Sequence, residues 1–235
     1  MGIVAISAHL DDAALSASAS LAGRDATVVT VFAAMPPPEV ELSSWDAHTG
    51  ATSSKDRQTE RLAEDAEAMR LLSAQGRYLD ELDRQYRRSG ERPGLDRIAR
   101  SIAGYFTGDS IEAWIPAALG GHPDHAIARD AALQAAAIAG LPEIVLYADY
   151  PYVLSFGPPS WLTSRPTEIS LTSSQRETKV KIIRAYRSQS LALGLSDADL
   201  AASPAKLNTE LFWRVALPDP GLIAAIPRAY FREGD

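Results

Sequence analysis

Cysteine is absent from the 235-residue sequence, and its absence limits how the chain can be stabilised and what it can bind. Disulfide bonds and thiolate ligands are both excluded. Any metal ion would have to be held by histidine, aspartate or glutamate, with water as a possible further ligand. Histidine is itself scarce, with four copies, so the positions of these residues are informative.

Long apolar runs are also missing from the sequence. The N-terminal run at residues 2–8 is far shorter than the roughly 20 residues of a membrane-spanning helix, and no basic leader precedes it. A secretory signal would need a basic start and a longer apolar stretch. The sequence therefore predicts a cytoplasmic protein without a membrane segment.

Positive charge is in the minority, with 23 Lys and Arg against 30 Asp and Glu and a net charge of -7. Recognition of nucleic acid needs clustered Lys and Arg, so we expect neither a nucleic-acid partner nor a polyanionic substrate. The hydrophobic share of 46% is typical of a globular protein. The length suits one domain spanning residues 1–235, and it leaves a homo-oligomer open.

Apolar stretches rich in β-branched residues alternate with amphipathic stretches along the chain. The expected strands are residues 2–8, 26–34, 78–82, 111–117 and 143–148. The expected helices are residues 12–22, 53–74, 94–106, 124–139 and 174–193, with Ser53 or Ser54 capping the second of them. This order predicts an α/β fold with a mostly parallel sheet and helices on both faces. The apolar run near residues 212–231 is not assigned to an element.

Two connecting segments, residues 35–52 and 149–166, are long for loops and combine proline with aromatic residues. Segments of this length are usually functional or disordered. Their aromatic side chains suit either the walls of a pocket or packing on the surface, and it is left open whether the segments close over a site. These side chains are Trp45, Tyr150, Tyr152, Phe156 and Trp161.

Three of the four histidines fall in two short windows that each follow an expected strand. The first window is His-Leu-Asp-Asp at residues 9–12, and the second window is His-Pro-Asp-His at residues 122–125. Both stand where a strand passes into a helix, and Pro123 suits a first helical position. In an open parallel sheet, ligands bind beyond the carboxyl ends of the strands, so the two windows can meet in one crevice.

Together the windows contain the ligand set of a catalytic zinc site. Such a site needs three protein ligands and an open position for water, and two imidazoles with one carboxylate form a known set. His9, Asp12 and His125 would supply these ligands. Fe(II) or Co(II) could take the place of zinc at such a site.

The other polar residues of the windows suit acid–base chemistry. Asp11 would be the general base for water, and His122, as an imidazolium, would stabilise the oxyanion of a cleaved amide or protonate its amine. Asp124 could orient His122. The plain alternative for Asp11 and Asp12 is helix capping, because aspartate is favoured there. The occurrence of two such windows together favours the catalytic interpretation, whereas His48, in a loop without a carboxylate pattern, is interpreted as a surface residue.

The segment Ala-His-Leu-Asp-Asp-Ala-Ala-Leu-Ser at residues 8–16 and the later Gly-Gly-His-Pro-Asp-His at residues 120–125 resemble the PIG-L/LmbE family of zinc-dependent N-deacetylases. The resemblance implies a Rossmann-like three-layer αβα fold and removal of acetyl groups from N-acetylated amino sugars and related glycoconjugates. It gives the residues of the windows the same roles as above. The commonest family form is His-Pro-Asp-Asp-Glu, and the chain departs from it at Leu10 and Ala13, neither of which is a ligand.

Other segments resemble one branch of the same family with lower specificity. Arg61 and Asp83 match family positions that contact the sugar, which implies a substrate-binding role for both. The alternatives are a solvated helix face for Arg61 and a turn residue for Asp83. The remaining similar segments lie at residues 147–152, 181–189 and 210–214.

These features predict a metal-dependent amide hydrolase that removes an acetyl group from a small N-acetylated amino sugar or a metabolite bearing one. One alternative is an amidase for a larger acyl group or a thiol-sugar conjugate. Another is a non-catalytic metal- or sugar-binding protein on the same scaffold. A dinucleotide-binding protein is disfavoured, because no Gly-x-Gly-x-x-Gly follows the first strand.

Overall fold

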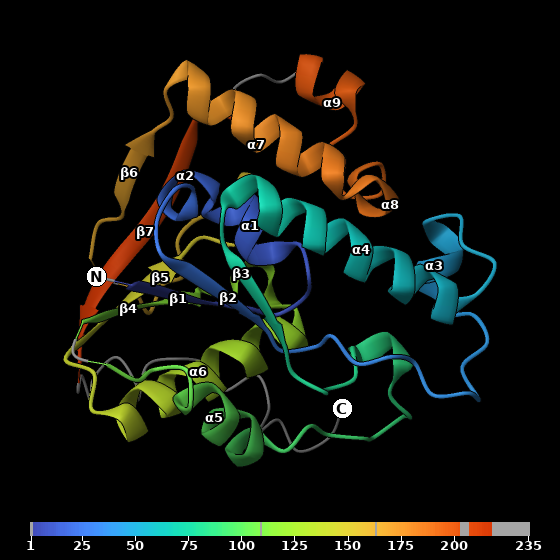
Figure 1. Cartoon of the computed structure of the whole chain (residues 1–235), viewed down its shortest axis with the longest axis horizontal. Helices are drawn as coiled ribbons and strands as arrows, with labels where there is room; N and C mark the ends of the chain where they lie inside the picture. Colours follow the sequence, from blue (N-terminus) through green and yellow to red (C-terminus); the bar gives the residue numbers. More distant parts are fainter. Residues whose placement is uncertain (1, 109, 163, 203–206, 218–235) are drawn as a thin grey trace.

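A seven-stranded sheet in the order β3-β2-β1-β4-β5-β7-β6 forms the centre of the computed structural model, which describes residues 2–108, 110–162, 164–202 and 207–217 (Figure 1). The strands are β1 Gly2–Ser7, β2 Ala26–Thr30, β3 Gln75–Tyr78, β4 Ile111–Pro116, β5 Glu143–Tyr147, β6 Thr167–Ser170 and β7 Thr209–Ala216. Strands β1 to β5 pair in parallel, and β7 runs antiparallel to both of its neighbours, β5 and β6. The expected Rossmann-like α/β fold is confirmed.

Helices cover both faces of the sheet and form the two outer layers of the fold (Figure 1). On one face lie α1 Asp12–Ser16, α2 Ser18–Leu21, α4 Ser54–Leu72 and α7 Ser173–Ala185, and on the other lie α5 Leu95–Ala103 and α6 Pro123–Ala139. Shorter helices are α3 Ser44–His48, α8 Arg187–Ser190, α9 Asp197–Ala202, and the 3-10 turns η1 Arg84–Tyr86, η2 Leu119–Gly121 and η3 Tyr152–Leu154. None of the helices in the described part of the chain is long and apolar enough to cross a membrane.

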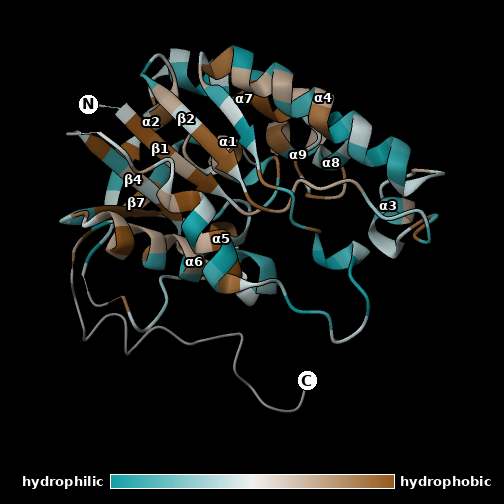
Figure 2. Cartoon of the chain, turned by 60° about the horizontal axis from the view of Figure 1, so that its bottom comes forward, coloured by the Kyte–Doolittle hydropathy of each residue, from teal (hydrophilic) through white to brown (hydrophobic). Residues whose placement is uncertain are grey.

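The central strands are apolar on both sides because both of their faces are covered. In β1, Ile3 and Ala5 belong to the core under α1, α4 and α7, while Val4 and Ile6 belong to the core over α5 and α6. Figure 2 shows the central strand β1 as a mostly hydrophobic ribbon, with hydrophilic residues on α4 and α5. A continuous apolar run such as Gly2–Ser7 is therefore what a strand at the centre of this sheet requires.

Two expected helix starts are confirmed by their capping bonds. The Ser53 side chain accepts a hydrogen bond from the backbone N–H of Asp56 and begins α4. His122 stands at the N-cap of α6, and Pro123 takes the first helical position, where its missing N–H costs nothing.

Several expected elements differ in detail. The strand expected at residues 26–34 ends at Thr30, and the strand expected at residues 78–82 lies earlier, at Gln75–Tyr78. The helix expected at residues 12–22 is divided at Ala17 into α1 and α2, because the serines bond to distant partners: Ser18 Oγ donates to Glu210 Oε1 at 2.8 Å. The helix expected at 174–193 is likewise divided, at Tyr186, into α7 and α8. Of the unassigned run at 212–231, residues up to Ala216 complete β7, and residues 218–231 lie outside the described part.

Candidate functional site

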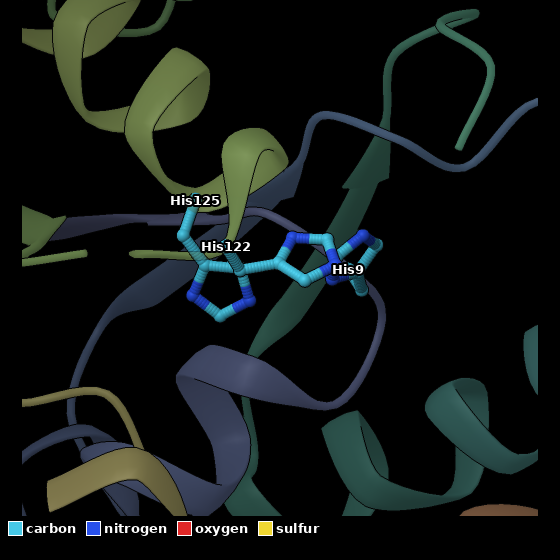
Figure 3. A group of neighbouring side chains, drawn as sticks. All are labelled: His9, His122 and His125. Atoms are coloured by element: carbon cyan, nitrogen blue, oxygen red, sulfur yellow. The ribbon is translucent and has the colours of Figure 1, made fainter. Parts of the chain in front are cut away.

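The two histidine windows follow neighbouring strands, so the sheet brings them together. Strands β1 and β4 pair in parallel, with Ala5 opposite Trp114, and β1 continues to β2 on its other side. The carboxyl ends of β1 and β4 thus stand where the strand order reverses, which is where open α/β sheets bind ligands. The imidazole centroid of His9 lies 5.1 Å from that of His122 and 5.3 Å from that of His125 (Figure 3).

The first window is a tight turn held by its own side chains. Ser7 Oγ accepts a hydrogen bond from the backbone N–H of Ala13 at 2.9 Å, across the whole turn. Asp12 Oδ2 accepts another from the backbone N–H of His9 at 2.7 Å. The same Oδ2 atom lies 3.3 Å from His9 Nδ1 and 3.3 Å from His125 Nε2. Asp12 of the first window therefore also contacts His125 of the second window.

These distances fit a tetrahedral metal site. Two ligands that each bind zinc at about 2.0–2.1 Å in tetrahedral geometry are separated by about 3.3–3.4 Å. The separations of the Asp12 carboxylate oxygen from the two imidazole nitrogens, both 3.3 Å, match this value. Two of the three separations within the set His9, Asp12 and His125 are therefore those expected around one divalent ion.

The outer nitrogen of each of these imidazoles faces a buried carboxylate, as is usual for histidines that bind metals. His9 Nε2 lies 3.3 Å from Asp124 Oδ2, and His125 Nδ1 lies 2.6 Å from Asp149 Oδ1. Each carboxylate can accept the ring N–H of its histidine, so the inner nitrogen, which faces Asp12, can bind a metal once it has lost its own proton. Both tautomers are then set for metal binding.

Asp124 contacts a different histidine from the one expected. Its side chain bonds to His9, accepts the backbone N–H of Arg84 at 2.9 Å and forms an ion pair with Arg87. His122 instead turns back on its own helix, where Nδ1 accepts the backbone N–H of Asp124 at 3.3 Å. The Asp124 carboxylate was expected to orient His122. In the structure, His122 instead accepts the backbone N–H of Asp124 and so caps α6.

His122 lies beside the candidate ligands, and one of its nitrogens is within 4.8 Å of a nitrogen of His9 and of His125, so the three histidines also form a group that could hold a metal ion. Because its Nδ1 accepts a hydrogen bond, the hydrogen of the neutral ring lies on Nε2, which cannot then bind a metal. Burial, with His9 and His125 nearby, lowers the pKa of His122 to about 4. His122 is thus a neutral hydrogen-bond donor at pH 7, whereas an imidazolium was expected.

The two neighbouring carboxyls of the first window have opposite pKa shifts. Burial and the charge of Asp12 raise the pKa of Asp11 to about 6, and its side chain caps no backbone N–H of α1. Burial also acts to raise the pKa of Asp12, but His125 and His9 lower it to about 2. Such a division is typical of a pair in which one carboxylate stays ionised and the other exchanges protons.

A pocket of about 460 Å³ opens in front of the two windows. Its walls include Leu10, Phe32, Trp45, Gln58, Asp83, Arg84, Gln85, Tyr150, Pro151, Tyr152, Tyr186, Gln189 and Leu193, together with Arg61 and the window residues His9, Asp11, Asp12, His122 and His125. Both long segments contribute to it, because Trp45 belongs to residues 35–52 and Tyr150 and Tyr152 to residues 149–166. Phe156 is half exposed, and Trp161 packs against Arg129, so these two are not part of the walls.

The two expected substrate-binding residues both line this pocket. Arg61 is nearly buried and already pairs with Asp46 at 3.2 Å, so only part of its guanidinium faces the pocket. The Asp83 carboxylate accepts hydrogen bonds from the backbone and the side chain of Gln85, at 3.1 and 2.7 Å. Its Oδ2 lies 3.9 Å from His9 Nε2, which puts Asp83 beside the first window.

Four residues of the site were not predicted as such: Ser7, Asp149, Tyr186 and Gln189. Asp149 carried a usable signal, because it follows the end of β5 as the windows follow β1 and β4. Its Oδ2 also accepts the backbone N–H of Leu119 at 3.0 Å, so one buried carboxylate holds both His125 and the turn before His122. Ser7 had no such signal, whereas Tyr186 and Gln189 lie in the segment 181–189 that resembles the family branch, without a role having been assigned to them.

Fold and site together are those of a metal-dependent hydrolase of the α/β type. A family model described as PIG-L, GlcNAc-PI de-N-acetylase, matches residues 4–136, which include both windows. The chain belongs to this family. It is an N-deacetylase, an enzyme that hydrolyses the amide bond of an N-acetyl group, and its site residues are suited to a divalent metal.

Solved structures of deacetylases resemble the chain over most of its length. Teicoplanin deacetylase Orf2 in a zinc-inhibited form is 26% identical, with a TM-score of 0.76 and coverage of 93% of this chain and 100% of that chain. The A40926 pseudoaglycone deacetylase Dbv21 is 30% identical, with a TM-score of 0.71 over 91% and 97% of the two chains. N,N′-diacetylchitobiose deacetylase from Pyrococcus horikoshii, 18% identical with a TM-score of 0.63 over 96% and 86%, shares the fold. No curated protein matches the sequence.

Proposed function

We propose that the enzyme is a zinc-dependent deacetylase in which His9, Asp12 and His125 hold the metal. The observation that carries the proposal is the position of Asp12 Oδ2, 3.3 Å from a nitrogen of each histidine, with the Asp11 carboxylate beside it. When bound, a divalent ion of this kind polarises an amide carbonyl and makes water more acidic. Other divalent transition metals suit the same ligands.

Asp11 and His122 divide the remaining work. Asp11 takes a proton from the attacking water, which its raised pKa favours near neutral pH. His122, as a neutral ring with its hydrogen on Nε2, donates a hydrogen bond to the oxyanion that develops from the carbonyl oxygen. Because His122 has no extra proton to give, Asp11 returns the proton to the departing amine, and acetate and a free amine result.

The substrate is an N-acetylated amino sugar or a small molecule that carries one. Aromatic walls and the polar groups of Asp83, Gln58 and Gln85 in one pocket support this class, since sugars pair an apolar ring face with hydroxyl groups. The related solved structures include a deacetylase–teicoplanin complex, the A40926 pseudoaglycone deacetylase and an N,N′-diacetylchitobiose deacetylase. The pocket volume of about 460 Å³ also has room for an acyl group longer than acetyl, which makes acyl length a variable to test.

The test is an assay of zinc-loaded and chelator-treated protein on N-acetylglucosamine, N,N′-diacetylchitobiose and N-acylglucosamines of increasing chain length, with detection of the released amine. We expect turnover with metal and none after chelation. His125→Ala should lose both metal and turnover, with metal content measured by elemental analysis. Fully loaded protein that releases no amine from any of these compounds would reject the proposed substrate class, and full metal content in His125→Ala would reject the ligand set.

A further inference from the structure

Residues 186–189, at the junction of α7 and α8, lie outside both windows and contribute to the pocket wall. Tyr186 and Gln189 are both buried and both line the pocket, yet neither belongs to the proposed chemistry. We propose that they are positioning residues for two parts of its wall. Tyr186 holds the turn that carries the general base, and Gln189 holds the wall where the sugar would bind. This inference rests on the proposed deacetylase function.

Tyr186 reaches the first window through one hydrogen bond. Its hydroxyl can donate to the carbonyl oxygen of Leu10 at 3.0 Å, and that carbonyl belongs to the peptide that joins Leu10 to Asp11. The orientation of this peptide determines where the Asp11 side chain begins. The hydroxyl oxygen also lies 2.8 Å from Asp65 Oδ1 on α4, and because it carries a single hydrogen it donates to either the Leu10 carbonyl or Asp65, and not to both at once. Removal of the hydroxyl would free the peptide without emptying the space that the ring fills.

Gln189 bonds to other residues of the pocket wall. Its Oε1 accepts a hydrogen bond from the indole N–H of Trp45 at 3.0 Å and another from the Arg61 guanidinium at 3.0 Å. Trp45 and Arg61 can only donate, so the atom that faces them both must be the amide oxygen. Its Nε2 donates to Ser188 Oγ at 2.9 Å, which agrees with this orientation. A single oxygen thus holds two side chains of the pocket wall, one from α3 and one from α4.

The segment is attached to α4 by separate bonds. The backbone N–H and the hydroxyl of Ser188 donate to the two carboxylate oxygens of Glu64, at 2.9 and 2.6 Å. Glu64 is buried on α4 and does not line the pocket. Loss of the Tyr186 hydroxyl or of the Gln189 amide therefore leaves the segment in place, and single variants at these positions should fold.

Two variants, Tyr186→Phe and Gln189→Met, test the two parts separately on whichever probe sugar wild-type protein deacetylates. A net contribution typical of one hydrogen bond corresponds to about a tenfold effect. We expect Tyr186→Phe to lower kcat by about that factor with KM within about twofold, and Gln189→Met to raise KM by a similar factor with kcat unchanged. Gln189→Glu keeps an acceptor for Trp45 and Arg61 and should restore most of the KM. Ser190→Ala, a change in α8 outside the pocket walls, is the matched control and should change neither constant.

Two further measurements do not depend on turnover. Zinc affinity, from competition with a chromophoric chelator, should be unchanged in both variants, because neither side chain contacts a ligand. Tryptophan emission should shift in Gln189→Met, where Trp45 loses its acceptor, and should not shift when the same change is made together with Trp45→Phe. Parallel changes of kcat and KM in both variants, or a lower Tm with unchanged kinetics, would overturn the inference. Wild-type protein that deacetylates none of the sugars would contradict the proposed function, while the emission shift would still decide the role of Gln189.

Discussion

The first window, after β1, and the second window, after β4, both lead from a parallel strand into a helix, but different kinds of contact hold them. Ser7 and Asp12 close the first turn through bonds to residues at most six positions away. The second turn depends on Asp149, which follows another strand, β5, and holds both His125 and the backbone of Leu119. A local turn can be read from the sequence, whereas a turn held across the sheet depends on which strands are neighbours.

The windows also differ in the group that each keeps beside the metal ligands. The first keeps Asp11, a carboxyl whose pKa burial and Asp12 raise to about 6. The second keeps His122, an imidazole whose pKa burial and the other histidines lower to about 4. The raised pKa of Asp11 brings that carboxyl closer to its neutral form, and the lowered pKa of His122 keeps that imidazole in its neutral form. One window therefore supplies a proton acceptor near neutral pH and the other a neutral hydrogen-bond donor.

Asp11→Asn should have the largest effect, because it removes the proton acceptor and keeps the shape of the side chain. We expect kcat to fall by about 10²–10⁴-fold, the usual contribution of a general base, with zinc content unchanged. The comparison within the same window is Asp12→Asn, which should lose zinc. Turnover of Asp11→Asn within tenfold of wild type would exclude Asp11 as the base.

His122→Asn tests the matching group of the second window. Asparagine is a favoured N-cap, so α6 should keep its start while the imidazole donor is lost. We expect kcat to fall by about 10²–10³-fold and zinc affinity to stay the same, as measured by chelator competition. A loss of zinc would instead make His122 a ligand and would remove the distinction between the windows.

Asp149→Asn tests whether a distant carboxylate holds the second window. An amide cannot accept the His125 N–H and the Leu119 N–H with the same strength as a carboxylate, so His125 should be less well oriented. We expect zinc affinity to fall by about 10–100-fold, with a smaller loss of kcat at saturating zinc. Asp96→Asn on the exposed side of α5 is the control, and equal affinities in the two variants would show that His125 needs no such support.

Asp65→Asn should act on stability rather than on turnover or zinc binding, and it bears on the support of the first window through Tyr186. Burial raises the pKa of Asp65 to about 6, although Tyr78 and Tyr186 donate hydrogen bonds to it. The unfolded chain has a value of about 3.9, so the stability that protonated Asp65 contributes is present at pH 4 and lost as the pH rises through about 6. The fall in unfolding free energy from pH 4 to pH 7 should be smaller in Asp65→Asn by up to about 3 kcal/mol. Denaturant titrations at both pH values measure it, and equal falls in the two proteins would show that Asp65 does not titrate in this range.

The fold could be predicted from the sequence because the signals for its helices and strands each lie within a short segment. Apolar runs for β1 and β4, the Ser53 cap and Pro123 at the start of α6 are all visible within a few residues. The windows were visible for the same reason. The partners of their side chains were not, since Asp124 could be assigned to its neighbour His122 by sequence distance but contacts His9 in the structure.

Irregular elements were the least predictable from sequence. The break at Ala17 depends on the hydrogen bond from Ser18 to Glu210 on β7, a strand that pairs with β5. The roles inferred for Tyr186 and Gln189 likewise depend on α7 and α8 lying against α4. Contacts of this kind are decided by packing between layers, which a single sequence does not show.

The contact between Asp124 of the second window and His9 of the first couples the stability of the two windows. Ligands for the metal come from both sides of the β1–β4 pairing, so an ion would bind the native sheet and have little affinity for a chain in which these strands have separated. Free metal at a hundredfold excess over its Kd would then add about 2.7 kcal/mol to the free energy of unfolding. The cell's supply of metal would in this way set the lifetime of the protein as well as its activity.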